Sequence, residues 1–498
     1  MERERSGWAA LLSGGNAARC AVVGGGMVLH ALNTFITVTV MPSVVRDIGG
    51  LQFFAWATTL YVLASLLGGA FCARLLHRVG PRWSYRAALL VFALGSLGCG
   101  LAGSMPLLLA GRFVQGLGAG TLSALSFTMV RVLFAPPLWS RAISVISAAW
   151  GVATLLGPAV GGIFAQYGAW RAGFWSMSLV APLLLLLVEL SLPRGIARAA
   201  APRTAMALLS LAVLAGSVLC VSLGSTATAP AWNVLGLVAA GAGLALFVWR
   251  EGRGGARLLP SGACNLATPL GTTYAAMSLL LIGINAEIFV PYFLQTLHGM
   301  QPIYAGYLSA LMSAGWTTGS VISASARPAL AHRVMVLGPL AMAASVALLF
   351  ALMPHPFTSP PALAAIGLGM ACMGLGIGMC WPHLGARVFA FAPESERELA
   401  AASITIVIMV TNAFGSALGG MITNLAGLTM PGGVVGAASA AHWLFGCFVV
   451  APLAAAAMVR RLLRHAVGGK EGLLFVNKKK QKNLIRWGTW PRRGGSSE

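Results

Sequence analysis

The amino-acid sequence predicts an all-α integral membrane protein with fourteen transmembrane helices. Of its 498 residues, 58% are hydrophobic and only 9% are charged, whereas about a quarter are charged in soluble globular proteins. Its apolar stretches reach the length of about 20 residues that a helix needs to cross a bilayer core. They are uniformly apolar, and backbone groups in lipid must be satisfied within the segment, so we expect helices and not a β-barrel.

The expected spans follow one another along most of the chain. In order, they are residues 20–42, 53–76, 84–103, 106–129, 141–165, 172–192, 205–224, 231–249, 268–297, 302–324, 334–353, 361–389, 399–427 and 437–460. Basic stretches with proline or glycine, 192–203 and 250–260, bracket the seventh and eighth spans. We therefore expect a six-helix bundle in 1–195, a two-helix insert with basic linkers in 196–260, a second six-helix bundle in 261–465 and a basic cytoplasmic tail in 466–498.

The positive charges predict the topology. When the loops are assigned alternately to the two sides, 30 of the 33 Lys and Arg residues fall on the side of the N-terminus. Only Arg46 and Arg171 fall on the other side, and Arg112 lies inside a span. This is the positive-inside pattern, and it predicts a multi-pass protein of a bacterial inner (plasma) membrane with both termini in the cytoplasm. It also explains the net charge of +22 without nucleic acid as a partner. The basic tail is either solvated or lies on anionic lipid.

The chemistry-bearing residues do not predict an enzyme. The sequence contains no HExxH, GxSxG or phosphate-loop motif, and its eight cysteines form no CxxC pair. We therefore expect neither a catalytic site nor a cofactor nor a bound metal.

One glycine-rich run, GVATLLGPAVGG in residues 151–162, is informative. Gly157 and Gly161 share a helical face with Ala153, and so smooth a stripe lets a neighbouring helix pack closely. Pro158 should bend the helix there. A common small-residue helix contact is the alternative to a functional role. The candidate conformational residues are Gly151, Gly157, Pro158, Gly161 and Gly162.

This run resembles the antiporter motif of the major facilitator superfamily, which that family carries in its fifth helix. Three further segments resemble motifs of the same family: RFVQGLGAG at 112–120, AWR at 169–171 with Phe174, and PYFLQ at 291–295. The last is similar to a seventh-helix signature of the fourteen-helix drug:proton antiporters, which also have an extra helix pair. The resemblance covers nearly all of residues 20–465, and it implies a fold of major-facilitator type that moves small molecules by rocking two halves about a central site.

Two positions depart from the family pattern. In the loop segment 73–82, His77 stands where the family has an Asp that is thought to latch one conformer. In the first helix, Asn33 stands where an Asp is usual, and an amide cannot titrate. His30, Asn33 and Thr37 share a helical face, which lines the cavity or makes interhelical hydrogen bonds. The loop-motif residues are His77, Arg78, Gly80 and Arg82.

Apart from the arginines within two residues of a span end, three charged residues fall inside the expected spans. Glu189 is close enough to a helix end to be solvated, whereas Arg112 and Glu287 lie deep, where a charge costs at least about 3 kcal/mol without water or a partner. Pro291 should kink the helix beside Glu287. Burial disfavours an ionised carboxylate and a nearby cation favours it, so Glu287 either handles a proton or substrate or forms a static pair with Arg112. The candidates for proton coupling or substrate binding are Glu287, Arg112, Asn33, Gln115, Tyr292 and Gln295.

The function predicted by the resemblance is proton-coupled export of small amphipathic or drug-like compounds by alternating access. The expected partners are the substrate, protons and the lipid bilayer, and we expect a monomer. Two alternatives remain: a carrier of one specific metabolite, in either direction, and a membrane scaffold or sensor that keeps the fold without transporting.

Overall fold

The computed structural model describes residues 11, 13, 15–192, 207–227, 229–253, 256–324, 326–356 and 359–468. All regular structure in these residues is helical. The first group of helices is α2 (Asn16–Ile48), α3 (Trp56–Leu101), α4 (Met105–Leu133), α5 (Trp139–Gln166) and α6 (Trp170–Ser191). The insert consists of α7 (Leu208–Ser225) and α8 (Pro230–Gly252). The second group is α9 (Pro269–Ile284), α10 (Val290–Leu297), α11 (Pro302–Ala324), α12 (Pro328–Leu352), α13 (Pro360–Phe391), α14 (Arg397–Leu425), α15 (Gly433–Phe448) and α16 (Val450–Gly468).

Four short 3-10 helices complete the described part of the chain. They are η2 (Leu51–Phe53), η3 (Pro136–Leu138), η4 (Asn285–Phe289) and η5 (Glu394–Glu396). The expected basic tail at 466–498 lies almost wholly outside the described residues, as do most of the first of the two basic linkers and the first ten residues of the chain.

Twelve helical stretches in the described residues are long and apolar enough to cross a membrane, where the sequence predicted fourteen. One of them is the continuous stretch Leu51–Leu101, which covers two expected spans. Within it, Gly80 leaves the helical conformation with φ 78° and ψ 174°, immediately before Pro81. The other difference is α11, whose 23 residues fall outside the twelve because its small and hydroxyl-bearing side chains lower its mean hydropathy.

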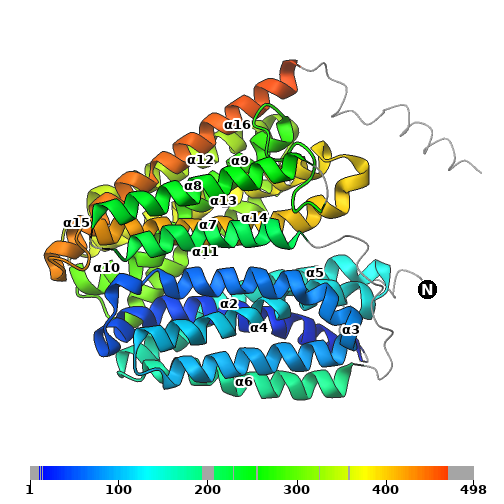
Figure 1. Cartoon of the computed structure of the whole chain (residues 1–498), viewed down its shortest axis with the longest axis horizontal. Coiled ribbons are helices and arrows are strands. Elements are labelled where there is room, and N and C mark those ends of the chain that lie inside the picture. Colours follow the sequence, from blue (N-terminus) through cyan, green and yellow to red (C-terminus); the bar gives the residue numbers. More distant parts are fainter. Residues whose placement is uncertain are drawn as a thin grey trace, which may run out of the picture.

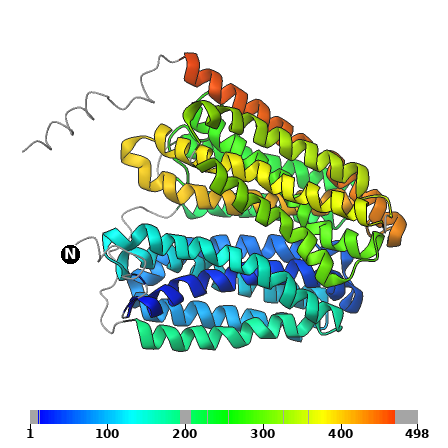
Figure 2. The ribbon, with the colours of Figure 1, turned by 180° about the vertical axis from the view of Figure 1, so that it is seen from behind.

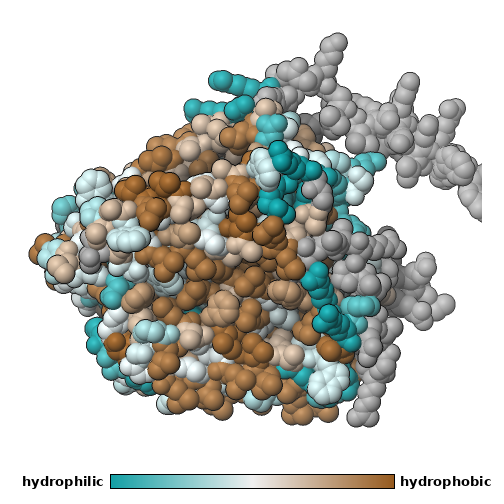
Figure 3. Space-filling view, in the orientation of Figure 1, coloured by the Kyte–Doolittle hydropathy of each residue, from teal (hydrophilic) through white to brown (hydrophobic). Residues whose placement is uncertain are grey.

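The helices form two packed groups that touch at one end and diverge towards the other in both ribbon views (Figures 1 and 2). The space-filling view shows a largely hydrophobic face, with hydrophilic side chains gathered towards its ends (Figure 3). Within the first group, α3 and α4 approach so closely that a Cβ on Gly120 would lie 1.9 Å from the Ser65 carbonyl oxygen. Close contact of this kind is how small residues hold membrane helices together.

The hydrogen bonds that join the two groups gather at one end of the molecule, which we call the sealed end. There, Arg46 donates to Gln295 over 3.3 Å and Gln166 to Gln301 over 3.3 Å. The Ser416 hydroxyl donates to the carbonyl of Ala55 over 3.1 Å. The other end of the first group is formed by the bend of α3 at Gly80, the end of α4 and the start of α5. These segments carry Arg74, Arg78, Arg82, Arg86, Arg131 and Arg141, and we call this the arginine-rich end. The two groups are therefore linked at the sealed end.

Candidate functional site

Arg112 is a buried cation in the middle of the first group, with 1% of its surface exposed. Its Nε donates to the Ala57 carbonyl oxygen over 3.1 Å and its Nη1 to Gln115 Oε1 over 2.5 Å. The guanidinium carbon lies 4.1 Å from the centre of the Tyr61 ring, a cation–π contact. A carbonyl, an amide and an aromatic face thus surround this charge.

The contacts of Arg112 extend into a polar network that crosses α2, α3 and α4. Gln115 Nε2 donates to Ser96 Oγ over 2.7 Å. The Tyr61 hydroxyl lies 3.0 Å from His30 Nδ1, and the two rings stack. Helices that share such a network are held in one arrangement, because each polar group in a dry interior must keep its partner.

Asn33 belongs to the same region, beside Tyr61. Its side chain is fully buried, and neither its amide oxygen nor its amide nitrogen has a hydrogen-bond partner. The Thr37 hydroxyl one turn on is also buried without a partner. Of the three residues predicted to share a face, His30 makes the interhelical bond to α3. Buried amides normally make hydrogen bonds, so the amide oxygen and nitrogen of Asn33 are an exception.

Glu287 lies where the second group breaks a helix. The sequence predicted a kink beside this carboxylate, and the structure confirms it: α9 ends at Ile284, the 3-10 helix η4 carries Glu287, and α10 starts at Val290 with Pro291 in its first turn. The Glu287 side chain is half-buried. The ion pairs of the described residues are Arg82–Glu189, Arg86–Glu189, Arg171–Asp47, Arg257–Glu396 and Arg397–Glu394. A static Glu287–Arg112 pair is therefore not formed here.

The neighbour of Glu287, Asn285, ties the broken helix to α14. Its Nδ2 donates to Asn412 Oδ1 over 3.1 Å and to the Leu281 carbonyl over 2.7 Å. A Cβ on Gly415 would lie 2.7 Å from the Asn285 side chain, so α14 needs glycine at that position. The half-buried carboxylate thus sits on a short segment that an amide pair joins to α14.

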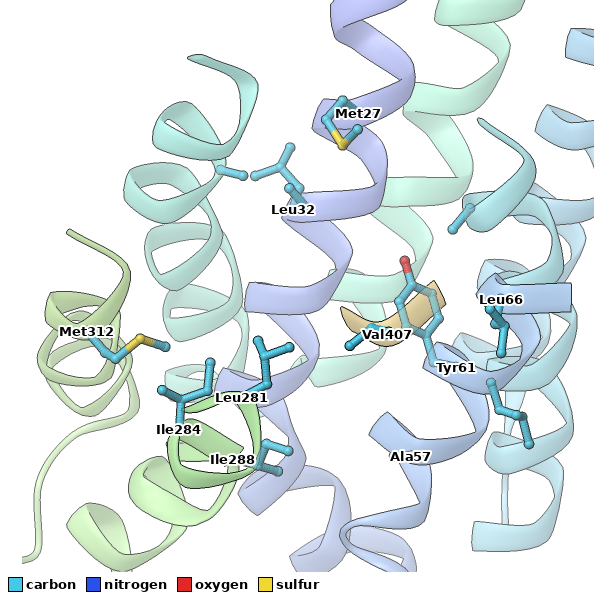
Figure 4. Close-up of a cluster of buried hydrophobic side chains, with 14 of the residues drawn as sticks. Met27, Leu32, Ala57, Tyr61, Leu66, Leu281, Ile284, Ile288, Met312 and Val407 are labelled. Carbon is cyan, nitrogen blue, oxygen red and sulfur yellow. The ribbon is translucent and has the colours of Figure 1, made fainter. Parts of the chain in front are cut away.

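Buried apolar side chains from both groups share one cluster. The cluster in Figure 4 includes Leu32 and Tyr61 from the first group and Leu281, Ile284, Ile288 and Val407 from the second. Tyr61, a member of this cluster, is also the aromatic side chain that contacts Arg112.

Two of the predicted site residues lie away from this centre. Tyr292 packs edge-on against Phe54 of the first group, with ring centres 5.6 Å apart, and Gln295 accepts the hydrogen bond from Arg46. Both contacts cross between the groups at the sealed end. The sequence grouped these residues with Glu287 as candidates for proton coupling or substrate binding, and the structure places both in contacts between the two groups.

The second half of the glycine-rich run on α5 packs towards the sealed end. A Cβ on Gly157 would lie 2.3 Å from Phe35 of α2, and one on Gly162 would lie 2.5 Å from Ile303 of α11. Gly161 faces Ile36, and Pro158 lies against Gly306. The run therefore packs α5 against its own group and against the second group at once. Gly151, by contrast, has open space around it.

The loop motif at the arginine-rich end contains an ion pair that the sequence did not predict. Arg82 Nη1 lies 3.3 Å from Glu189 Oε2, and Arg86 Nε lies 2.6 Å from Glu189 Oε1. Arg82 also donates to the carbonyl oxygens of Glu189 and Leu192 at the end of α6. Glu189 was expected to be merely solvated; its side chain is 28% exposed and joins α6 to the second part of α3. The three arginines at 78, 82 and 86 are the sequence feature that could have indicated an acidic partner for this segment.

Comparisons with known proteins agree with this architecture. A family model described as Major Facilitator Superfamily matches residues 23–384. A protein of Mycobacterium tuberculosis named as a probable multidrug-efflux transporter is 37% identical over 470 residues, covering 92% of this chain and 96% of the relative. The tetracenomycin C resistance and export protein of Streptomyces glaucescens is 28% identical and covers 64% of this chain and 61% of its own length.

Solved structures show the same fold at low sequence identity. A D-xylose–proton symporter matches with a TM-score of 0.61 at 18% identity, covering 89% of this chain and 96% of the symporter. A peptide transporter matches with a TM-score of 0.66 at 13% identity, covering 89% of this chain and 95% of that protein.

Proposed function

The chain belongs to the major facilitator superfamily and is a multi-pass membrane transporter, and from this premise we propose that it exports small amphipathic or drug-like compounds by alternating access. One observation carries the proposal: the two helix groups are joined by hydrogen bonds at the sealed end, whereas the ribbons diverge towards the arginine-rich end. A carrier that opens to one side at a time needs this asymmetry. The names of the relatives support export.

The proposal includes the orientation and the full helix count. Fourteen spans result when α3 is divided at Gly80 and α11 is counted as a span. Both termini then lie in the cytoplasm of a bacterial cell, together with the arginine-rich end, in accord with the positive-inside rule. The domains are the two six-helix bundles at 1–195 and 261–465, the insert at 196–260 and the tail at 466–498.

Proton coupling is assigned to Glu287 in this proposal. It is a half-buried acid without an ion-pair partner among the described residues, and it sits on the broken helix of the second group. Asn33 cannot titrate, and Arg112 keeps its charge in a fixed set of contacts. Rocking of the halves changes the water and the field around Glu287, so that the carboxyl group can take up a proton on one side and release it on the other.

Arg112 and Glu287 act together across the two halves in this mechanism. They form no ion pair in the state described here. A conformer that brings the guanidinium field nearer to the carboxylate favours its ionised form and so favours proton release.

The test replaces Glu287 with Gln in the full chain reconstituted into proteoliposomes. Export of a fluorescent amphipathic dye driven by a pH gradient should fall by at least about a hundredfold, because removing a titratable group abolishes the coupling step rather than weakening it. Glu394→Gln is the matched control, since Glu394 is an acid with an 87% exposed side chain. Undiminished pH-driven export in Glu287→Gln would remove Glu287 from the mechanism.

A further inference from the structure

The two-helix insert, α7 and α8, contacts both helix groups, and its contacts with the second group are apolar and extended. Figure 1 shows both helices of the insert among those of the second group. Val218 and Val221 of α7 share a buried cluster with residues of α14, and a Cβ on Gly224 would lie 3.1 Å from Met421. The residues of α14 in this cluster are Ala413, Ala417 and Met421. An apolar interface therefore joins the second half of α7 to the second group.

The linker that follows α8 ties the insert to the second group at the end opposite the sealed end. The carboxylate of Glu251, near the end of α8, accepts hydrogen bonds from the backbone N–H groups of Leu258 and Leu259 over 3.0 and 2.9 Å. Glu396 of η5 accepts from the backbone N–H and the hydroxyl of Ser261 over 2.6 and 2.7 Å. Hydrogen bonds to ionised groups are about twice as strong as those between neutral groups. The two carboxylates thus hold the linker against α8 and against the connection between α13 and α14.

The carbonyl groups at the end of α7 are shared between the two helix groups. The last four carbonyls of a helix have no partner within the helix itself. In α7, the middle two of them accept from backbone N–H groups of the turn that follows. The first and the last reach other helices. The Ser222 carbonyl accepts from Trp56 Nε1 of α3 over 3.1 Å, and the Ser225 carbonyl accepts from Asn424 Nδ2 of α14 over 2.9 Å.

The amide of Asn424 turns this helix end into a junction of three parts. Its Nδ2 also donates to the Gln52 carbonyl of η2, which belongs to the first group, over 2.9 Å. If the first group moves away from α14 at the sealed end, the bond to Gln52 breaks. The bond from Asn424 to Ser225 joins α14 to the insert, and it can persist through that movement.

The contacts between the insert and the first group are of a weaker kind. They are the hydrogen bond from Trp56 and the packing of Val62 of α3 at the edge of the α7–α14 cluster. Neither contact involves a charged group. A neutral hydrogen bond can be exchanged for one with water at a small net cost, so these contacts can form and break as the carrier works.

We propose that the insert moves with the second group as one body, and that the Ser222 carbonyl at its end is a latch that Trp56 of the first group releases when the sealed end opens. The insert thereby adds to the contacts that keep this end closed, and it favours the conformer described here. This inference rests on the proposed function, because it names a part of the chain that controls the alternation.

The first test does not depend on transport. Trp56→Phe in the full chain removes the indole N–H and keeps an aromatic ring, and hydrogen exchange of the backbone amides is followed by mass spectrometry. Exchange in residues 51–58 should rise by about fivefold, the change in an opening equilibrium that corresponds to one lost hydrogen bond, and exchange in the linker at 256–262 should stay the same. Trp232→Phe is the matched control, since this indole stands in the first turn of α8 and is 61% exposed. Equal exchange in the two variants would overturn the latch.

The second test joins the insert covalently to one group or to the other. Thr226→Cys is combined with Leu425→Cys of α14 or with Gln52→Cys of η2, in a full chain whose native cysteines are replaced by alanine. Each pair is then joined by a short bifunctional thiol reagent. These substitutions leave the Ser222 and Ser225 carbonyls and the amide of the junction unchanged.

The two cross-links should have opposite effects on dye export in proteoliposomes. Joining positions 226 and 425 should leave export within about twofold of the unjoined pair, whereas joining 226 and 52 should lower it by at least about tenfold, because the sealed end can no longer open. Loss of export in the first case, or full export in the second, would show that the insert does not move with the second group. A wild-type chain that exports no dye would refute the proposed export itself, and the exchange measurement would then decide on the latch.

Discussion

The two helix groups hold their deep charge in opposite ways. In the first, Arg112 lies in an unbroken helix, and its guanidinium is bound by Ala57, Gln115 and Tyr61. In the second, Glu287 lies where the helix is broken, half-buried and outside any ion pair of the described residues. The first half thus carries a positive charge that is held in place by its contacts, and the second half carries an acid that can take up or release a proton. This difference suggests that the halves divide the work of coupling between a constant field and a titrating group.

The largest expected effect comes from removing the fixed charge. Arg112→Leu should lower pH-driven export by at least about a hundredfold, while the free energy of unfolding changes by less than about 1 kcal/mol, since the desolvation cost of a buried cation offsets its hydrogen bonds. Export assays in proteoliposomes and thermal unfolding in detergent measure the two quantities. A large loss of stability with export retained would show that Arg112 only supports the fold.

Arg112→Lys is the matched variant for this experiment. Lysine keeps the positive charge but lacks the planar fork that reaches both Ala57 and Gln115. We expect an intermediate loss of export, about tenfold, because the field survives while the contacts do not. Export equal to that of Arg112→Leu would mean that the contacts, and not the charge, matter.

The sequence could predict that Arg112 and Glu287 lie deep within membrane-spanning helices, but not which side chains surround them. The spans, the burial of Arg112 and the break at Pro291 follow from length, charge and proline alone. The pairing of Glu189 with Arg82 and Arg86, and of Gln295 with Arg46, joins helices far apart in the sequence. Periodicity indicates which face of a helix a residue occupies, and not which helix lies against that face. The sequence predicted that α3 is divided into two spans, and the chain leaves the helical conformation at Gly80, between the two expected spans.

A second experiment makes the first half resemble the second. Asn33→Asp introduces an acid where a fully buried amide has no hydrogen-bond partner, on the helix that carries His30 of the Arg112 network. The new carboxylate should offset the positive field of Arg112 and raise export of a cationic dye relative to a neutral one by about tenfold, the ratio that corresponds to roughly 1.4 kcal/mol. Initial export rates of two dyes that differ in charge give the ratio. Asn33→Leu, which adds no charge, should leave the ratio unchanged, and a shift there would trace the effect to packing.

The smallest expected effect tests the break that sets Glu287 apart. Pro291 has no N–H to donate to the Glu287 carbonyl oxygen, so Pro291→Ala restores a donor at the interruption between α9 and α10. A more continuous helix should reduce the freedom of the segment that carries the carboxylate, and export should fall by about threefold while the protein becomes more stable by about 1 kcal/mol. Pro302→Ala, in the first turn of α11, is the control, because proline at that position displaces no hydrogen bond. Faster export with unchanged stability in Pro291→Ala would mean that the break is incidental, and that the contrast between the two halves lies in the charges alone.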